Sequence, residues 1–253
     1  MSEFEGKVAL VTGASRGIGE AAAVALAAAG CAKIAIQYNS YPEGAEQTLA
    51  AIRAAGADGI AIQADLSDMA AARAFNQKVR SEVGGVDFLI NNAGSLIRRT
   101  PLDKYDEALF DAVMNLNVKS LWFLTQAVAP VMIERGGGAI VNLTSIAARN
   151  GGGPGATIYA AAKAAVSAIT KGVAKELAPK NIRVNAVSPG TVDNHFHEVF
   201  STREILDSVV KATPAGRLAT NQDIAECIVF LCSMKSSYII GQTIELNGGF
   251  YMV

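Results

Sequence analysis

The sequence predicts a single α/β domain in which a parallel sheet of about seven strands is covered by helices on both faces. Short, apolar, β-branched segments alternate with longer, alanine-rich segments along the chain. A strand that is apolar throughout is typical of a sheet buried on both faces, and the alternation predicts crossover connections between parallel strands. No repeat, low-complexity tract or linker divides the sequence, so residues 1–253 are expected to form one doubly wound domain.

The expected elements follow one another from the first apolar segment to the last. Strands are predicted at residues 8–12, 34–38, 59–64, 88–91, 139–143, 183–188 and 243–246. Helices are predicted between them at residues 17–29, 42–55, 68–83, 105–135, 158–178 and 221–234.

Two segments interrupt this alternation. The glycine-rich residues 151–155 are expected to form a flexible loop just before a helix. The polar and aromatic residues 191–213 form an insertion after the sixth strand, and loops of that length are often lids. Both segments follow carboxyl ends of strands, which is where open α/β sheets bind ligands.

Composition limits the classes of partner. With 51% hydrophobic and 18% charged residues the chain can bury a large core. A formal net charge of −1 gives no electrostatic reason to expect nucleic acid or an anionic membrane. Residues 1–6 have neither the basic flank nor the apolar centre of a signal peptide, and apolar stretches such as 21–29 are short of the ~20 residues that span a bilayer. Three scattered cysteines do not suggest a disulfide framework, so a cytoplasmic location is expected.

A glycine-rich turn joins the first strand to the first helix. Residues 12–19 read Thr-Gly-Ala-Ser-Arg-Gly-Ile-Gly. The glycines permit a tight turn, and the helix N-terminus offers free N–H groups to a pyrophosphate. Their spacing differs from the commoner dinucleotide fingerprint, and an ordinary turn without a ligand is the alternative. The position after the first strand of a βαβ unit favours cofactor binding.

The residues after the second strand bear on the choice of dinucleotide. An acidic residue there would hold the ribose 2′-hydroxyl of NAD, but residues 37–40 read Gln-Tyr-Asn-Ser. Arg16, with the small polar side chains of Asn39 and Ser40, suits a 2′-phosphate instead. NADP(H) is therefore the predicted cofactor and NAD(H) is possible, while a solvated surface position for Arg16 is the alternative.

Tyr159 and Lys163 are four residues apart in a predicted helix, so their side chains lie on one face. A free tyrosine has a pKa near ~10 and is a poor base at neutral pH. A neighbouring ammonium group favours the phenolate and is expected to lower the Tyr159 pKa. The pair can then act as a general acid/base, although the spacing alone also fits a helix-surface pair.

These motifs occur together with several others in a fixed order. The sequence has Asn-Asn-Ala-Gly at 91–94, Asn-Leu-Asn-Val at 115–118, Ser145, Ser-Pro-Gly at 188–190 and Asn-Gly-Gly at 247–249. Over nearly its whole length the chain resembles the short-chain dehydrogenase/reductase family, and in particular its 3-oxoacyl-(acyl-carrier-protein) reductase-like members. The resemblance implies a Rossmann-type fold and an enzyme that moves hydride between nicotinamide and a carbonyl or alcohol carbon.

The resemblance also implies roles for individual residues. Tyr159 would exchange a proton with the substrate oxygen, and Ser145 would hydrogen-bond that oxygen. Lys163 would hold the ribose hydroxyls, and the main-chain carbonyl of Asn117 would anchor a water that links Lys163 to solvent. Asn194 stands where the family often has threonine. The implied cofactor-binding residues are Gly13, Ser15, Arg16, Gly17, Ile18, Gly19, Asn39, Ser40, Asp65, Leu66, Asn91, Ala93, Gly94, Tyr159, Lys163, Pro189, Gly190 and Val192.

Three functions remain open from the sequence. The first is an NADP(H)-dependent ketone reductase similar to 3-oxoacyl reductases. Arg135 and Lys180 are its only candidates for docking an acidic carrier, so a carrier-bound thioester is not expected to be the specific substrate. The second is a sugar, polyol or xenobiotic alcohol dehydrogenase of the same family. The third is a non-catalytic NADP(H)-binding sensor, against which the complete set of Asn117, Ser145, Tyr159 and Lys163 argues.

Residues in the insertion and one arginine pair bear on the substrate. Phe196 and Phe200 favour an apolar substrate, whereas His195 and His197 favour a polar one. Two histidines without a third partner do not predict a metal site. The Arg-Arg pair at 98–99 could attract an anionic substrate, with a solvated loop as the simpler interpretation. Relatives are commonly homotetramers built through the helices expected at 105–135 and 158–178, so a homotetramer is expected here.

Overall fold

Seven parallel strands form one sheet in the order β3-β2-β1-β4-β5-β6-β7. The computed structural model describes residues 3–253. The strands are β1 (Val8–Val11), β2 (Lys33–Tyr38), β3 (Asp58–Gln63), β4 (Phe88–Asn91), β5 (Gly138–Leu143), β6 (Ile182–Pro189) and β7 (Thr243–Leu246). Every neighbouring pair is parallel, so the predicted sheet is confirmed. The strand order reverses between β1 and β4, and a crevice for a ligand forms at such a point.

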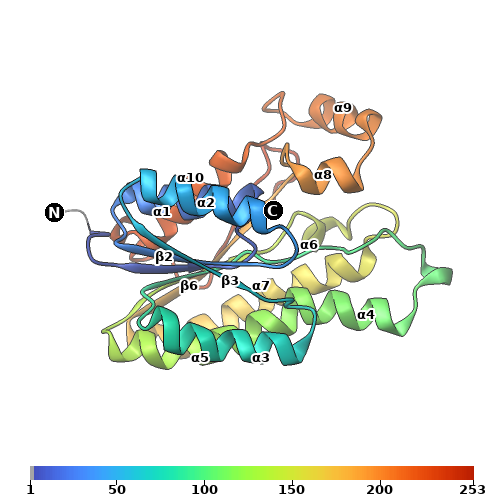
Figure 1. The fold of residues 1–253 in the computed structure, drawn as a ribbon. Coiled ribbons are helices and arrows are strands. Elements are labelled where there is room, and N and C mark those ends of the chain that lie inside the picture. Colours follow the sequence, from blue (N-terminus) through green and yellow to red (C-terminus); the bar gives the residue numbers. More distant parts are fainter. Residues whose placement is uncertain (1–2) are drawn as a thin grey trace.

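Helices cover both faces of this sheet (Figure 1). One face carries α1 (Gly17–Ala29), α2 (Pro42–Ala54) and α10 (Asn221–Cys232), and the other carries α3 (Met69–Lys78), α5 (Ser120–Glu134) and α7 (Thr157–Leu177). Successive strand residues point to opposite faces, so Ala9 and Val11 join one core cluster while Leu10 joins the other. All three of these side chains are fully buried.

Two helices, α3 and α4 (Glu107–Met114), begin where an aspartate side chain caps them. The Asp68 carboxylate accepts hydrogen bonds from the amides of Ala70 (2.6 Å) and Ala71 (3.2 Å), so α3 begins at Met69. A π turn, η1 (Val79–Val83), then extends this helix to the predicted end. The Asp106 carboxylate accepts from the Leu109 amide at 2.7 Å, so α4 begins two residues after the predicted start at 105.

The long helix on this face contains a second π turn. The turn η3 (Asn115–Lys119) joins α4 to α5, and the resulting helix over Glu107–Glu134 has the length and composition of a membrane span. An apolar helix that packs on a sheet passes the same test, and Leu124, Val128 and Met132 of this helix are buried in the core. Its opposite side exposes apolar residues, among them Trp122 and Phe123.

Residues 191–213 contain two helices that the sequence pattern did not predict. They are α8 (His195–Phe200) and α9 (Arg203–Ala212), which project beyond the carboxyl ends of the strands (Figure 1). Asn194 caps α8 and Thr202 caps α9 through their side-chain oxygens. No residue of either helix is buried, so local capping and not core packing defines them.

Candidate active site

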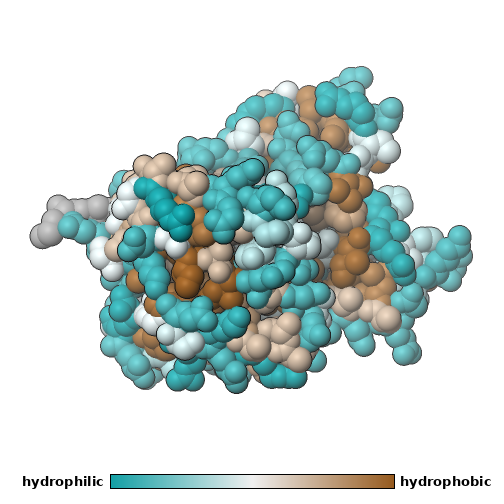
Figure 2. Space-filling model, viewed as in Figure 1, coloured by the Kyte–Doolittle hydropathy of each residue, from teal (hydrophilic) through white to brown (hydrophobic). Residues whose placement is uncertain are grey.

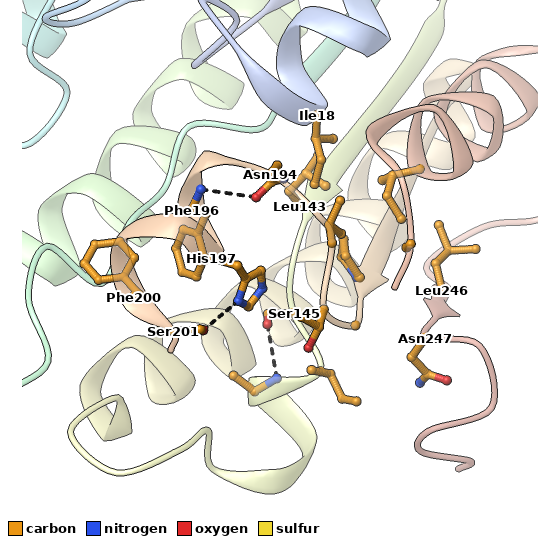
Figure 3. Close-up of a pocket in the computed structure, with 18 of the residues that line it drawn as sticks. Ile18, Leu143, Ser145, Asn194, Phe196, His197, Phe200, Ser201, Leu246 and Asn247 are labelled. Atoms are coloured by element: carbon orange, nitrogen blue, oxygen red, sulfur yellow. Dashed lines mark hydrogen bonds between the residues drawn. The ribbon is translucent and has the colours of Figure 1, made fainter. Parts of the chain in front are cut away.

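One cavity of about 1060 Å³ opens at the carboxyl ends of the strands. Gly13, Arg16 and Gly17 line one end of it, and Ser145 and Tyr159 line another part. Both α8 and α9 contribute to its wall, and Figure 3 shows α8 side chains facing Ser145 across the cavity. The cavity therefore brings the predicted cofactor turn, the predicted catalytic residues and the 191–213 segment together.

The glycine turn has a backbone that only glycine readily adopts. Gly13 and Gly17 have φ angles of +64° and +67°, in the left-handed region. A Cβ at Gly19 would lie 2.5 Å from Asn92 Nδ2 and would also collide with the Gly13 carbonyl oxygen. The first residues of α1 have no side-chain cap, so their amides remain available to an anion.

Buried polar side chains hold this turn in place. Asn92 Nδ2 donates to the carbonyl oxygens of Thr12 (2.8 Å) and Gly13 (2.9 Å). Gln37 Oε1 accepts from the Gly13 amide at 2.8 Å, and Thr48 Oγ1 donates to the Ala14 carbonyl at 2.9 Å. None of Asn92, Gln37 and Thr48 was predicted as a site residue. The available signal was a polar residue inside an otherwise apolar strand or helix, as at Gln37.

Of the residues predicted to contact the adenosine part of the cofactor, only some line the cavity. The Arg16 guanidinium lies over the Tyr41 ring, 4.1 Å from its centroid, and Arg16 lines the cavity. Asn39 and Ser40 are exposed at the end of β2 and do not line it. Asp65 is also exposed outside the cavity, where its Oδ1 accepts from the Ser67 amide (2.9 Å) and hydroxyl (2.7 Å).

Four other predicted cofactor contacts also lie outside the cavity lining, namely Ser15, Gly19, Leu66 and Asn91. The Asn91 side chain points away from the cavity and into the core. Asn91 Nδ2 donates to Asn142 Oδ1 at 2.9 Å and to Thr125 Oγ1 at 3.2 Å, deep between β4, β5 and α5. These two bonds satisfy Asn91 Nδ2, whereas Asn91 Oδ1 is buried without a hydrogen-bond partner among the described residues. The remaining predicted contacts do line the cavity: Gly13, Arg16, Gly17, Ile18, Ala93, Gly94, Tyr159, Lys163, Pro189, Gly190 and Val192.

The four predicted catalytic residues come together around Gly94. A Cβ at Gly94 would lie 2.6 Å from Asn117 Oδ1 and 2.8 Å from Lys163 Nζ. Lys163 Nζ donates to the Leu143 carbonyl at 2.8 Å and lies 5.7 Å from the centroid of the Tyr159 ring. Ser145 follows β5, and its hydroxyl oxygen accepts from the Ala147 amide at 3.1 Å. Ser145, Tyr159 and Lys163 line the cavity, and Asn117 is buried behind them.

The π turn η3 positions Asn117. Its Nδ2 donates to the carbonyl oxygens of Ser95 and Val113, each at 2.8 Å. Its Oδ1 is buried without a hydrogen-bond partner in the described part of the chain. A buried polar atom without a partner is costly, and such atoms concentrate at sites that bind water or ligands.

Burial dominates the electrostatics of the catalytic pair. It raises the pKa of Tyr159 to about 12, although a hydrogen bond from Ser145 acts in the opposite direction. It lowers the pKa of Lys163 to about 8. The Tyr159 pKa is thus raised in this structure and not lowered as expected, because desolvation of the phenolate outweighs the Ser145 hydrogen bond. The Tyr159 phenol carries its proton at neutral pH.

The α8 side chains lie next to this pair. The Phe196 ring is 5.9 Å from the Tyr159 ring and 5.2 Å from the His197 ring, measured between centroids. His197 Nδ1 lies 3.0 Å from Ser201 Oγ, and His195 Nδ1 pairs with Glu198 at 3.1 Å (Figure 3 for His197). Within residues 3–253, no group of three or more His, Cys, Asp or Glu side chains is arranged to hold a metal ion.

A family model matches nearly the whole domain, from the glycine turn to the C-terminal segment. A family model described as enoyl-(acyl carrier protein) reductase matches residues 13–251. A 3-oxoacyl-[acyl-carrier-protein] reductase, FabG of Staphylococcus aureus, is 40% identical over 97% of this chain and 98% of its own. The chain belongs to the short-chain dehydrogenase/reductase family. As a member of this family it is an oxidoreductase that acts on a ketone or the corresponding secondary alcohol.

Solved structures of this short-chain dehydrogenase/reductase fold agree closely. A 7α-hydroxysteroid dehydrogenase in complex with NADH and 7-oxo glycochenodeoxycholic acid is 36% identical, with a TM-score of 0.90 over 97% of this chain and 94% of that one. A gluconate 5-dehydrogenase from Burkholderia cenocepacia, in complex with NADP and tartrate, is 34% identical, with a TM-score of 0.88 over 97% and 95% of the two chains. The fold prediction is therefore confirmed over the whole domain.

Proposed function

We propose that this protein is an NADP(H)-dependent reductase that converts a ketone into a secondary alcohol. The observation that carries the proposal is that Ser145, Tyr159 and Lys163 line the same cavity as the uncapped start of α1. A proton donor and an anion-binding helix N-terminus in one cavity are what reduction of a carbonyl by a dinucleotide requires.

The residues that line the cavity fit a nicotinamide dinucleotide. The amides at the start of α1 would hold the pyrophosphate, and Gly19 lets the glycine turn pack closely against this helix. Arg16 would pair with the 2′-phosphate, and Lys163 would hydrogen-bond the nicotinamide ribose. The cofactor supplies the hydride when it is bound.

Ser145 and Tyr159 would handle the substrate oxygen. The Ser145 oxygen accepts from the Ala147 amide, and its hydroxyl would donate to the substrate carbonyl. The Tyr159 phenol, protonated because its pKa is raised to about 12, would donate its proton as negative charge develops on that oxygen. A raised pKa favours reduction over oxidation at neutral pH. The main-chain carbonyl of Asn117 would anchor the water that returns a proton from solvent.

The preference for NADP(H) over NAD(H) is supported by two features of the turn. Arg16 stacks on Tyr41 at 4.1 Å and has no carboxylate within 4.0 Å among the described residues, so its charge is available to a phosphate. Residues 37–40, after the core of β2, contain no acid that would bind the 2′-hydroxyl of NAD. Solved relatives use either cofactor, since one is in complex with NADH and another with NADP.

Two substrate types fit this cavity, and each has one supporting observation. A 3-oxoacyl-like substrate fits the apolar side chains of Ile205, Leu206 and Val209 on α9. A dehydrogenase of sugar acids or polyols is the second candidate, because Arg99 and His197 also line the wall. In either case residues 191–213 would form the substrate lid.

The test measures loss of NADPH absorbance across a panel of ketones that includes 3-oxoacyl thioesters and keto sugars. Turnover of at least one ketone, with NADPH preferred over NADH, is expected. Binding of NADPH without turnover of any ketone would instead indicate a sensor and overturn the reductase proposal.

The assembly proposed is a homotetramer in the cytoplasm. Trp122 and Phe123 on α5 are 40% and 38% exposed, and the apolar C-terminal residues 250–253 are also exposed. Exposed aromatic residues gathered on one helix are typical of a surface that another subunit covers. Three unpaired cysteines are consistent with a reducing compartment. Light scattering of the purified protein tests the assembly, and a monomer would contradict it.

A further inference from the structure

A single arginine fixes the cavity wall that faces the catalytic residues. Arg99 Nε donates to the Phe200 carbonyl at 2.7 Å, and its Nη1 donates to the Pro154 carbonyl at 3.0 Å. The adjacent Thr100 amide donates to the Gly155 carbonyl at 3.1 Å. These bonds tie the segment after β4 to the end of α8 and to the glycine-rich loop at 151–155. The guanidinium is therefore held in place at the edge of the cavity.

No carboxylate forms an ion pair with Arg99 in the part of the chain that the structure describes, and Asp193 is the acidic residue whose charge acts on the adjacent His197. The acidic side chains of the cavity lining are already paired, Asp223 with Arg217 at 2.6 Å and Glu245 with Arg149 at 2.8 Å. No carboxylate lies within 4.0 Å of Arg99 in residues 3–253. Its neighbour Arg98 pairs with Asp106 at 3.0 Å and does not line the cavity. Two adjacent arginines thus differ in both pairing and position.

His197 adds a neutral hydrogen-bonding group to the same wall. Burial, and then the nearby Arg99, lower the pKa of His197 to about 4, so the ring is neutral at physiological pH. Its Nδ1 contacts Ser201 at 3.0 Å, and Figure 3 shows the ring between Ser201 and Ser145. A hydroxyl that donates to Nδ1 leaves the proton on Nε2, which is then the ring nitrogen available to a ligand.

We infer that Arg99 and His197 form a subsite for a carboxylate of the substrate, so that the preferred substrate is an oxo acid. The inference rests on the proposed reductase function. The remaining Nη2 of Arg99 and, in the tautomer with its proton on Nε2, the His197 ring give two donors on one wall, which matches the two oxygens of a carboxylate. The carboxylate would fix the substrate so that its carbonyl faces Ser145 and Tyr159.

The test compares oxo acids with their methyl esters, which keep the ketone and remove the negative charge. Reduction of 2-, 3- and 5-oxohexanoate and of the three methyl esters is followed with NADPH, and kcat/KM is obtained for each. At least one acid is expected to exceed its own ester by about tenfold, the usual effect of one charge-assisted hydrogen bond. If none of the three acids has a higher kcat/KM than its own methyl ester, the carboxylate subsite is wrong, whereas the reductase proposal still stands.

Three variants assign the preference to this wall. Arg99→Gln is expected to reduce the acid-to-ester ratio about tenfold, and Arg99→Lys to restore part of it. Arg98→Gln, the matched control, is expected to leave the ratio unchanged. Equal losses on acid and ester in Arg99→Gln would mean that the arginine only holds α8 in place, which contradicts the inference.

A binding measurement separates this inference from the reductase proposal. Hexanoate should compete with the oxo acid more strongly than hexanamide, and Arg99→Gln should remove the difference. If no ketone is reduced at all, the reductase proposal fails. Equal inhibition by hexanoate and hexanamide defeats the subsite alone.

Discussion

The two ends of the cavity are built in different ways. At the cofactor end the glycine turn is held by Gln37 and Thr48, whose side chains are 2% and 0% exposed. At the substrate end α8 and α9 contain no buried residue and are held mainly by caps and by Arg99. A turn fixed by buried hydrogen bonds suits a ligand that is always the same. A lightly packed wall tolerates substitutions that alter substrate specificity without unfolding the protein.

Tyr159→Phe should have the largest effect. The substitution keeps the ring contact with Phe196 and removes the proton that the substrate oxygen must receive. We expect kcat for reduction to fall about 10²–10⁴-fold with little change in melting temperature. Stopped-flow or steady-state NADPH oxidation measures the first quantity and calorimetry the second. A variant that retained turnover at saturating cofactor would place the proton donor elsewhere.

Gly19→Ala should disrupt the cofactor end. The new methyl group would meet the Gly13 carbonyl oxygen and Asn92 Nδ2, neither of which can move without breaking the braced turn. Overpacking of this kind costs about 1–3 kcal/mol of unfolding free energy, and NADPH affinity should fall with it. Denaturant titration and fluorescence of bound NADPH measure the two effects. Gly172→Ala, inside α7 with open space around it, is the matched control for adding a methyl group to a helical glycine.

The pH dependence should separate Tyr159 from Lys163. Reduction needs the protonated phenol, and because the Tyr159 pKa is raised to about 12, kcat should stay level from neutral pH upward and fall only as that value is approached. The Lys163 pKa is lowered to about 8, so the ammonium is lost as the pH rises through 8 and KM for NADPH should then increase. Initial rates at varied NADPH test this difference. A decrease in kcat that begins below pH 8 would contradict it.

Arg16→Ala should weaken the preference for NADPH over NADH without changing the preference among ketone substrates. Loss of the guanidinium is expected to lower kcat/KM for NADPH about tenfold relative to NADH. Arg53→Ala, which removes an exposed arginine at the end of α2, should leave the ratio unchanged. A ratio unaffected by Arg16→Ala would show that other groups select the cofactor.

The smallest effect on stability is expected on α9. Ile205 is 49% exposed, so Ile205→Ala should change the unfolding free energy by less than about 0.5 kcal/mol. The same change at Ile224 of α10, which is fully buried, should cost about 2–5 kcal/mol. Chemical denaturation of the two variants compares them directly. Similar losses at both positions would mean that α9 is as firmly packed as the core helices.

The sequence predicted the features that depend on local patterns. All seven strands, the glycine turn and the Tyr159–Lys163 pair follow from apolar segments, glycine positions and helical spacing. The bracing of the turn by Gln37 and Thr48 depends on contacts between residues 24 and 34 positions apart, which no local pattern encodes. The Tyr159 pKa was predicted in the wrong direction because spacing reveals a neighbouring charge but not the depth of burial. The helix α8 was missed because it has only six residues. The helix α9 was missed because residues 191–213 were interpreted as one lid segment, although Ile205, Leu206 and Val209 recur at helical spacing.

The π turn η3 sets the positions of a buried residue of the candidate active site and of exposed aromatic residues on the same helix. It takes in one more residue than an α turn, and it directs Asn117 inward while Trp122 and Phe123 remain outside. Removing that extra residue would rotate everything after it by about 100° relative to α4. Trp122 and Phe123 would then move relative to the Asn117 side chain. The register of this helix would therefore affect both the proposed subunit contact and the proposed proton route through Asn117.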